Sequence, residues 1–204
     1  MGGMLHLTQS GIQHAIQSYQ ADVALRHRSV YTSDQLDQFR RAAVMIPMFE
    51  YNNDWHILLT QRSDTVEDHR GQVAFPGGAR EKEDKDLSET ALREMQEEIG
   101  VKPEDVDIFG HLGDMSILTG FLVRIYVGRI PWPYEIKIAR EEVKSVFSIP
   151  IPWLADSENH HIQFRNYAGR EVPVIFFDYY DGYQLWGASA EMTLGLLKAL
   201  NLSG

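Results

Sequence analysis

The segment 87–99 carries the clearest helical pattern in the chain, and short apolar runs flank it on both sides. Four apolar residues recur at the spacing that places them on one helix face, which would turn toward the core. Asp86 stands at the N-cap position, Glu89 follows three positions later in the capping-box pattern, and Gly100 supplies a C-terminal stop. The four apolar residues are Leu87, Ala91, Met95 and Ile99. The fold must therefore pack one amphipathic helix against strands.

The apolar runs are short and separated by turn residues, which is typical of strands. Residues 43–51 and 55–61 are predicted to form a hairpin around Asn52-Asn53-Asp54, and residues 72–75 a strand that ends at the turn 76–78. Further strands are predicted at 106–112 and 121–130, a second hairpin at 162–167 and 172–180 around the turn 168–170, and a helix or strand at 143–149.

Helical patterns return at both ends of the chain. Residues 8–26 and a short segment capped by Ser33 are predicted to form a helical extension that covers residues 1–40. A last helix is predicted at 190–201, which closes a main domain of residues 41–204. Strands, one helix, more strands and a final helix indicate the α+β class with a mixed sheet.

The composition limits the partners that this chain can bind. Lys and Arg number 19 and Asp and Glu 29, so the net charge of −10 provides no basic stripe for nucleic acid. Without cysteine, disulfides, thiolate zinc sites and cysteine nucleophiles are excluded. No apolar run reaches the roughly 18 residues of a membrane span and no signal peptide is visible, so a cytoplasmic protein is expected. Small phosphorylated molecules remain possible partners, because a divalent cation can lie between protein carboxylates and a phosphate group.

Three glutamates share one stripe of the predicted helix. Glu94, Glu97 and Glu98 fall within an arc of roughly 100°, so their charges repel one another. A divalent cation relieves this repulsion, and Mg²⁺ prefers oxygen ligands. The alternative is a solvated acidic face in which Arg93 and Glu97 form an i,i+4 pair. The upstream turn 76–78 favours the metal site, because its glycines bring backbone carbonyls close to a ligand.

These residues resemble the Nudix family. Its box reads Gly, five residues, Glu, seven residues, Arg-Glu, an aliphatic residue, any residue, Glu-Glu, any residue, Gly and an aliphatic residue. Arg93 to Val101 match the second half position by position. Counted from Gly78, Asp84 takes the place of the first Glu, and eight residues instead of seven separate it from Arg93. The resemblance implies an α/β/α sandwich and magnesium-dependent, or manganese-dependent, cleavage of a diphosphate linkage.

The longer loop with Asp is similar to the coenzyme A pyrophosphatase branch of the family. The branch's upstream signature is matched by Leu58, Leu59, Thr60, Arg62, Ser63, Gly71, Phe75, Pro76, Gly77 and Gly78. The signature also contains an Arg between Ser63 and Gly71, but Glu67 stands at that position here. Arg70 or His69 would then take over the role of the missing Arg. The first hypothesis is a hydrolase that converts coenzyme A or acyl-CoA to 3′,5′-ADP and (acyl-)4′-phosphopantetheine. Glu67 favours another nucleoside diphosphate compound (ADP-ribose, NADH or a dinucleoside polyphosphate), and an inactive ligand sensor is the third hypothesis.

The resemblance assigns roles within the box. Glu94 and Glu98 would hold the metal, with a carbonyl at Gly78 as a further ligand. Glu97 would be a third ligand or the group that orients or deprotonates water. Arg93 would fix the glutamates through charge-assisted hydrogen bonds.

Residues outside the box would complete the site. Glu142 is the candidate general base, with a surface position as the alternative. Arg62 would hold a phosphate or form a structural salt bridge, and Phe75 would stack on a base or pack in the core. The candidate substrate contacts are Arg62, Ser63, Phe75, Gly77 and Arg70. The expected partner is a small nucleoside diphosphate substrate, with a homodimer through the N-terminal helices or the aromatic run 176–180 as one option.

Overall fold

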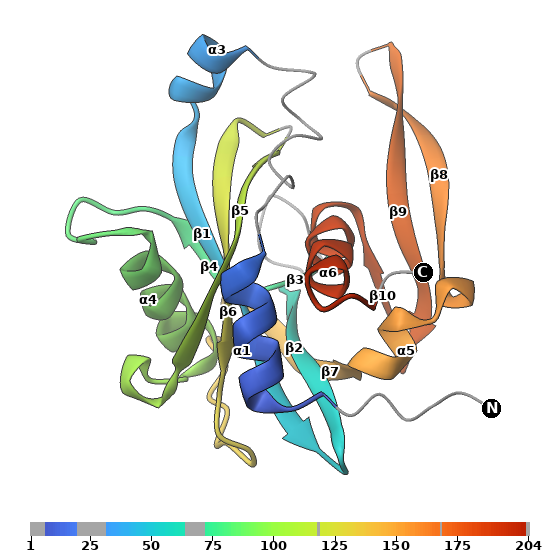
Figure 1. Cartoon of the computed structure of the whole chain (residues 1–204). Coiled ribbons are helices and arrows are strands. Elements are labelled where there is room, and N and C mark those ends of the chain that lie inside the picture. The colour runs from blue at the N-terminus through green and yellow to red at the C-terminus, as the bar shows by residue number, and fades with distance from the viewer. Residues whose placement is uncertain (1–6, 20–31, 64–71, 118, 168, 203–204) are drawn as a thin grey trace.

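The computed structural model describes residues 7–19, 32–63, 72–117, 119–167 and 169–202. Within them, one large sheet has the strand order β3-β2-β1-β6-β5, with β4 paired to β1 and β7 paired to β2 (Figure 1). β1 and β6 run parallel and the other pairs antiparallel, so the sheet is mixed. The strands are β1 Arg40–Tyr51, β2 Asp54–Arg62, β3 Val73–Ala74, β4 Gly77–Ala79, β5 Asp107–Ile117, β6 Phe121–Arg129 and β7 Val143–Pro150.

The β1–β2 connection is the predicted hairpin. Asn52 and Asn53 have φ angles of 51° and 67°, in the left-handed region that a two-residue type I′ turn requires. Asparagine tolerates this conformation better than most residues. The last residue pair of the hairpin, next to the turn, is Tyr51 opposite Asp54. Local turn chemistry therefore sets the register of the two strands that run through the middle of the sheet.

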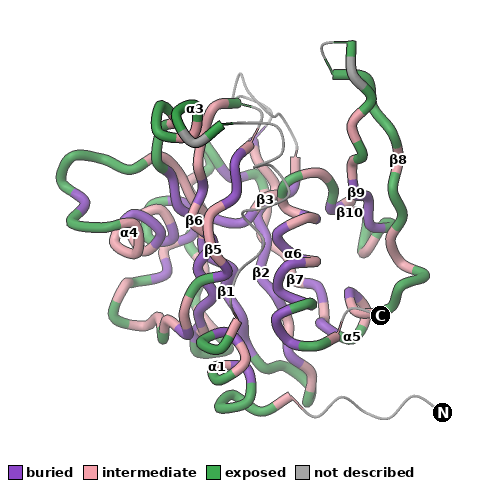
Figure 2. The backbone as a smooth tube through the Cα atoms, turned by 45° about the horizontal axis from the view of Figure 1, so that its top comes forward, coloured by how far each residue is buried: buried purple, intermediate pink, exposed green. Residues whose placement is uncertain are grey.

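Helices cover both faces of the large sheet (Figures 1 and 2). α4 (Leu87–Ile99) packs on one face, and α1 (Gln9–Ser18) and α6 (Gly187–Ala199) pack on the other. The short helix α3 (Ser33–Asp37) precedes β1. The α+β class and the α/β/α sandwich are thus confirmed. None of the helices in the described part of the chain is long and apolar enough to cross a membrane.

Two apolar clusters fill the space between the large sheet and the helices on its two faces. The cluster under α4 contains Ala91, Met95 and Ile99, which are fully buried, as the sequence pattern predicts. The cluster on the other face contains Ile12 and Ile16 of α1, so this N-terminal helix is part of the packed core. The division of the chain at residue 40 stays a prediction.

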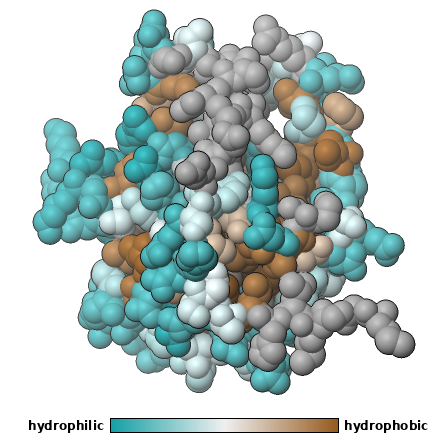
Figure 3. Space-filling model, in the orientation of Figure 1, coloured by the Kyte–Doolittle hydropathy of each residue, from teal (hydrophilic) through white to brown (hydrophobic). Residues whose placement is uncertain are grey.

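A second sheet with the order β10-β9-β8 follows the large one. Its hairpin extends from the body of the molecule, and hydrophobic side chains reach the surface on this side (Figures 1 and 3). Ile162 and Phe164 are 60% and 66% exposed, whereas Phe176 and Phe177 of the aromatic run are buried. The homodimer stays a prediction. The elements here are α5 Ile151–Ala155, β8 His160–Tyr167, β9 Arg170–Tyr180 and β10 Tyr183–Trp186, with single 3₁₀ turns at Pro103–Asp105 and Ser157–Asn159.

The turn predicted at 76–78 was wrong, because Gly77–Ala79 forms the strand β4 against β1. The glycines permit this close approach, since a Cβ on Gly77 would lie 2.5 Å from the carbonyl oxygen of Ala43. The ambiguous segment 143–149 is the strand β7, because it pairs along β2. β10 and α5 were not predicted at all.

Helix ends and caps differ from the prediction in four places. α6 begins at Gly187, three residues before the predicted start, and α1 ends at Ser18, while residues 20–26 lie outside the described part. Thr32, not Ser33, caps α3 by accepting a hydrogen bond from the backbone N–H of Gln35. The Glu89 carboxylate accepts from the backbone N–H of Lys85 instead of Asp86, so the capping box of α4 is only half formed.

Candidate active site

The predicted glutamates lie where α4 crosses β4. Gly78 pairs with Ala43 of β1, and the carboxylate of Glu94 rests directly on the α-carbon of Gly78. A Cβ at Gly78 would meet all three carboxyl atoms of Glu94, with Oε2 at 2.8 Å. The glycine at this position therefore creates the space that the Glu94 carboxylate occupies.

Glu98 is the most deeply buried of the three glutamates, with 4% of its surface exposed. Its pKa is raised to about 8, chiefly by burial and then by the nearby Glu94 charge. Arg62 and a hydrogen bond from the backbone N–H of Gly77 act in the opposite direction on this pKa. Burial also raises the pKa of Glu94, although Arg93 opposes that shift. The buried Glu98 and the partly buried Glu94 thus repel each other when both are ionised.

Arg93 connects three carboxylates around this site. Its Nη1 donates to Glu94 and Glu97, at 2.9 Å each, and its Nη2 donates to the carbonyl oxygen of Ala79 at 3.1 Å. Its Nε and Nη2 also bind both oxygens of Asp84, at 3.1 Å each. This fork-shaped pairing fixes the guanidinium plane. The contacts agree with the positioning role that the sequence predicts for Arg93.

Asp84 is the main residue of the site that sequence reasoning left without a role. It is 5% exposed and accepts hydrogen bonds from Thr90 Oγ1 at 2.8 Å and from the backbone N–H of Glu81 at 2.9 Å, besides Arg93. The hydrogen bonds from Arg93 chiefly lower its pKa to about 2. The sequence signal was present, because an acid stands at the seventh position of the box. Asp84 holds Arg93, which in turn holds Glu94.

We expect Asp84→Asn to destabilise the fold by about 3 kcal/mol at neutral pH, because it removes one partner of a buried ion pair. The low folded pKa of Asp84 gives stability that is fully present above its ordinary pKa of 3.8 and is lost as the pH falls through about 2. Urea unfolding at a series of pH values from about 5 downward should therefore show a steeper loss in the native protein than in the variant. Parallel curves would contradict the assigned ion pair.

Glu97 differs from its two neighbours. Its side chain is 56% exposed, and its carboxylate turns to Arg93. Within the described residues, no three His, Cys, Asp or Glu side chains are grouped closely enough to enclose a metal ion. The roles of Glu94 and Glu98 as metal ligands, and of Glu97 as a third ligand, stay predictions.

Arg62 and Glu142 lie close enough to Glu98 for their charges to act on its pKa, and Ser63 contacts Glu142 through the backbone. Ser63 is buried, and its backbone N–H donates to the carbonyl oxygen of Glu142 at 2.8 Å. The Glu142 charge raises the pKa of both Glu94 and Glu98, which places this exposed carboxylate near them. The Nε atom of Arg62 is buried and has no hydrogen-bond partner among the described residues.

Two predicted substrate contacts have different outcomes. Phe75 is 4% exposed and packs in the core cluster that includes β2 and α6, which leaves little of its ring open to a ligand. Arg70, like His69 and Glu67, lies outside the described residues. A substrate role for either residue stays a prediction.

The residues present fit a hard divalent cation. The buried carboxylate of Glu98, the partly buried carboxylate of Glu94 and the backbone carbonyls of β4 offer only oxygen donors. Mg²⁺ is commonly held by one or two carboxylates and completed by water and substrate phosphates. A cation would also remove the repulsion between Glu94 and Glu98.

The sequence matches a known family and its members. Residues 39–168 match the family described as NUDIX domain. The chain is 37% identical over 163 residues to the "Uncharacterized Nudix hydrolase NudL" of Citrobacter koseri, which covers 80% of this chain and 82% of that protein. The protein of the same name from Salmonella paratyphi B is 35% identical over 175 residues, covering 86% and 88%.

Solved structures share the fold at low sequence identity. A MutT/nudix family protein from Enterococcus faecalis has a TM-score of 0.56 and 15% identity, covering 96% of this chain and 75% of that chain. The Nudix hydrolase RenU from M. smegmatis has a TM-score of 0.52 and 16% identity, covering 78% and 86%. These likenesses concern the fold alone.

Proposed function

We propose a substrate for this chain, which belongs to the NUDIX domain family and is a Nudix hydrolase acting on nucleoside diphosphate compounds. The proposed reaction is cleavage of the diphosphate linkage of coenzyme A or acyl-CoA. The products would be 3′,5′-ADP and (acyl-)4′-phosphopantetheine. The observation that carries the hydrolysis is the pair of mutually repelling carboxylates at the glycines of β4, of which Glu98 is buried and Glu94 partly buried.

Nudix hydrolases generally use a divalent metal such as Mg²⁺. When bound, such an ion, Mg²⁺ or alternatively Mn²⁺, neutralises diphosphate oxygens and lowers the pKa of a bound water. Glu94 and Glu98 would hold it, with the carbonyl of Gly78 as a further ligand. Arg93 and Asp84 keep the Glu94 carboxylate in place through the hydrogen bonds described above.

The reaction adds one water to the diphosphate. The water oxygen forms a bond to one phosphorus, the bridging P–O bond breaks, and the bridging oxygen leaves with the other phosphate. A base must take the proton of the attacking water. Glu142 suits this role, because it is exposed and its charge acts on Glu94 and Glu98. Glu97 is the second candidate, and Arg62 would hold a phosphate with its fork of donors.

We expect Glu142→Gln to reduce kcat about a hundred-fold, as loss of a general base does. The acid limb of the pH–rate profile should move or vanish, since that limb would report the base. Glu141→Gln is the matched control, because it removes the same charge one residue away at a position that is also exposed. Equal activity of the two variants would transfer the role of base to Glu97.

The upstream signature supports coenzyme A as the substrate, and Glu67 supports a different nucleoside diphosphate compound. Purified protein should be incubated with Mg²⁺ and either coenzyme A, acetyl-CoA, ADP-ribose, NADH or a dinucleoside polyphosphate, and the products separated by chromatography. Release of 3′,5′-ADP only from the coenzyme A compounds is the expected result. Turnover of ADP-ribose or NADH alone would overturn the substrate, and ligand binding without any turnover would indicate a sensor.

A further inference from the structure

The strand β8 forms an outer edge of the second sheet. It is 8 residues long, and β9 is its only strand neighbour in the described part of the chain. Figures 1 and 2 both show β9 on the side of the hairpin toward the body of the molecule and β8 on the outer side. In an antiparallel pair, about half of the backbone N–H and C=O groups of an edge strand point away from its neighbour. β8 therefore presents a row of backbone groups to which another strand can pair.

β8 lacks the features that usually prevent edge strands from pairing. Soluble proteins block such edges with proline, lysine and other charged side chains, or with bulges. Residues 160–167 include no Pro, Lys, Asp or Glu, and their pairing with β9 is regular along the whole strand. Ile162 and Phe164 are exposed, and Ile162 lies opposite the buried Ile175. The apolar face of the hairpin thus continues from the core to this edge, as strand addition requires.

The charge pattern favours a second copy of this chain as the added strand. The chain carries a net charge of −10, so two copies repel each other in general. β8 contains no carboxylate, and Arg165 is its only Lys or Arg. The guanidinium of Arg165 donates to Gln163 at 2.9 Å and lies over the ring of Phe176. Two β8 strands can therefore approach each other without bringing carboxylates of these strands together.

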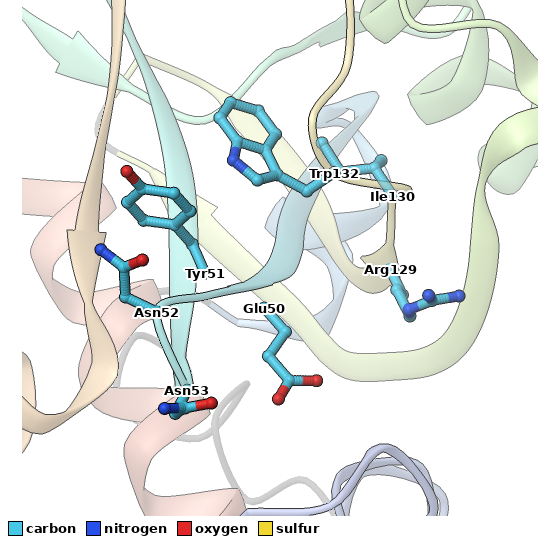
Figure 4. A pocket seen from close by; sticks show the side chains of 7 residues that line it. All are labelled: Glu50, Tyr51, Asn52, Asn53, Arg129, Ile130 and Trp132. Carbon is cyan, nitrogen blue, oxygen red and sulfur yellow. The ribbon is translucent and has the colours of Figure 1, made fainter.

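The hollow at the β1–β2 turn is a poorer surface for a second copy. It is lined mainly by polar side chains, among them Asn52, Asn53 and Arg129 (Figure 4). Side chains alternate along β1, so Glu50 points to the opposite side of the strand from Tyr51 (Figure 4). The hollow therefore offers no continuous apolar face, whereas β8 does.

Two antiparallel β8 strands are self-complementary about Phe164. A two-fold axis perpendicular to the sheet places residues of the same face opposite one another, so Phe164 meets Phe164 of the second copy. Arg165 then lies opposite the neutral Gln163 of the second copy. A pair centred on Gln163 would instead place Arg165 opposite His161, which is cationic when protonated. Aromatic pairs across strands stabilise a sheet and like charges destabilise it, so the register about Phe164 is favoured.

We propose that β8 is the interface of a two-fold homodimer, in which the three-stranded sheets of two copies join in the order β10-β9-β8-β8-β9-β10. The new outer edges are the β10 strands, which are only 4 residues long and continue directly into α6. Assembly therefore closes at two copies. This interface differs from one through the aromatic run 176–180, because Phe176 and Phe177 are buried.

Sedimentation velocity of the full chain over a concentration series tests the association. We expect a monomer–dimer equilibrium with a Kd on the order of 10 µM, because a pair of edge strands buries less than a standard interface. Phe164→Lys should weaken the dimer about ten-fold or more, since lysine blocks an edge. Tyr179→Lys is the matched control, because Tyr179 is 69% exposed but lies on β9. A native protein that stays monomeric, or a dimer that Phe164→Lys leaves intact, would overturn the interface.

Single cysteines test the register, because the chain has no cysteine of its own. Residues directly opposite each other in antiparallel strands have Cα atoms about 4.5–5.5 Å apart, a separation that a disulfide bridges. On oxidation at low protein concentration, Phe164→Cys should give mainly disulfide-linked dimer, because this position faces itself across the two-fold axis. Tyr179→Cys, the control, should stay monomeric. Equal yields of linked dimer from the two variants would refute the pairing, and this readout remains valid even if Phe164→Lys does not fold.

Discussion

Glu98→Gln is expected to reduce magnesium-dependent hydrolysis by about a thousand-fold, the range for losing one charged group that stabilises the transition state. The same variant should be at least as stable as the native protein without metal, because it removes a buried group whose ionisation beside Glu94 costs stability. Because the pKa of Glu98 is raised on folding, the contribution of this group to stability is fully present only below its ordinary pKa of 4.5 and is lost as the pH rises through about 8. The stability advantage of the variant should therefore grow from neutral to alkaline pH.

Thermal unfolding with and without Mg²⁺ separates a metal ligand from a residue that only supports the fold. The native protein should gain stability on addition of Mg²⁺, because a ligand that binds only the folded state stabilises that state. Glu98→Gln should lose most of that gain, and Glu97→Gln, at the 56% exposed neighbour, should keep it. A Glu98→Gln protein that remains active, or that still gains full stability from Mg²⁺, would refute the metal site.

The sequence predicts α4 and its buried face because the signals for a helix are local. Asp86 accepts hydrogen bonds from the backbone N–H groups of Ser88 and Glu89, and Gly100 adopts φ 71° after the last helical residue. The helix therefore has the predicted bounds of 87–99. The Asn52-Asn53 turn is predictable for the same reason, since two adjacent residues contain all of its chemistry.

Features that depend on distant contacts were not visible in the sequence. β4 exists because Gly77–Ala79 meets the start of β1, more than thirty positions earlier in the chain. The position of Asp84 beneath Arg93 depends on how the loop before α4 folds back, which no periodicity describes. The segment 143–149 has an apolar pattern that suits either a helix or a strand, and only its pairing with β2 decides between them. Local chemistry thus predicts the glutamate helix, and tertiary packing supplies the partners that fix its side chains.

Gly77→Ala and Gly78→Ala are expected to have opposite effects, although the residues are adjacent and the substitution is the same. At Gly77 the new Cβ would lie 2.5 Å from the carbonyl oxygen of Ala43 and 2.7 Å from the α-carbon of Val44, backbone atoms that cannot move without shifting β1. We expect a loss of about 3 kcal/mol in the free energy of unfolding, at the upper end for overpacking. At Gly78 the three atoms nearest to the new Cβ all belong to the carboxyl group of Glu94, which can rotate away.

Gly78→Ala should therefore keep near-native stability without metal and lose about a hundred-fold in activity, because the Glu94 carboxylate is displaced from the site. Urea unfolding and magnesium-dependent hydrolysis, measured on both variants, give the comparison. If Gly78→Ala keeps both its activity and its stabilisation by Mg²⁺, then Glu94 does not act from the position it occupies on Gly78. If Gly77→Ala is as stable as the native protein, the close contact between β4 and β1 is absent in solution. Gly77→Ala therefore tests the pairing that brings β4 under α4, and Gly78→Ala tests the position of the carboxylate that this pairing supports.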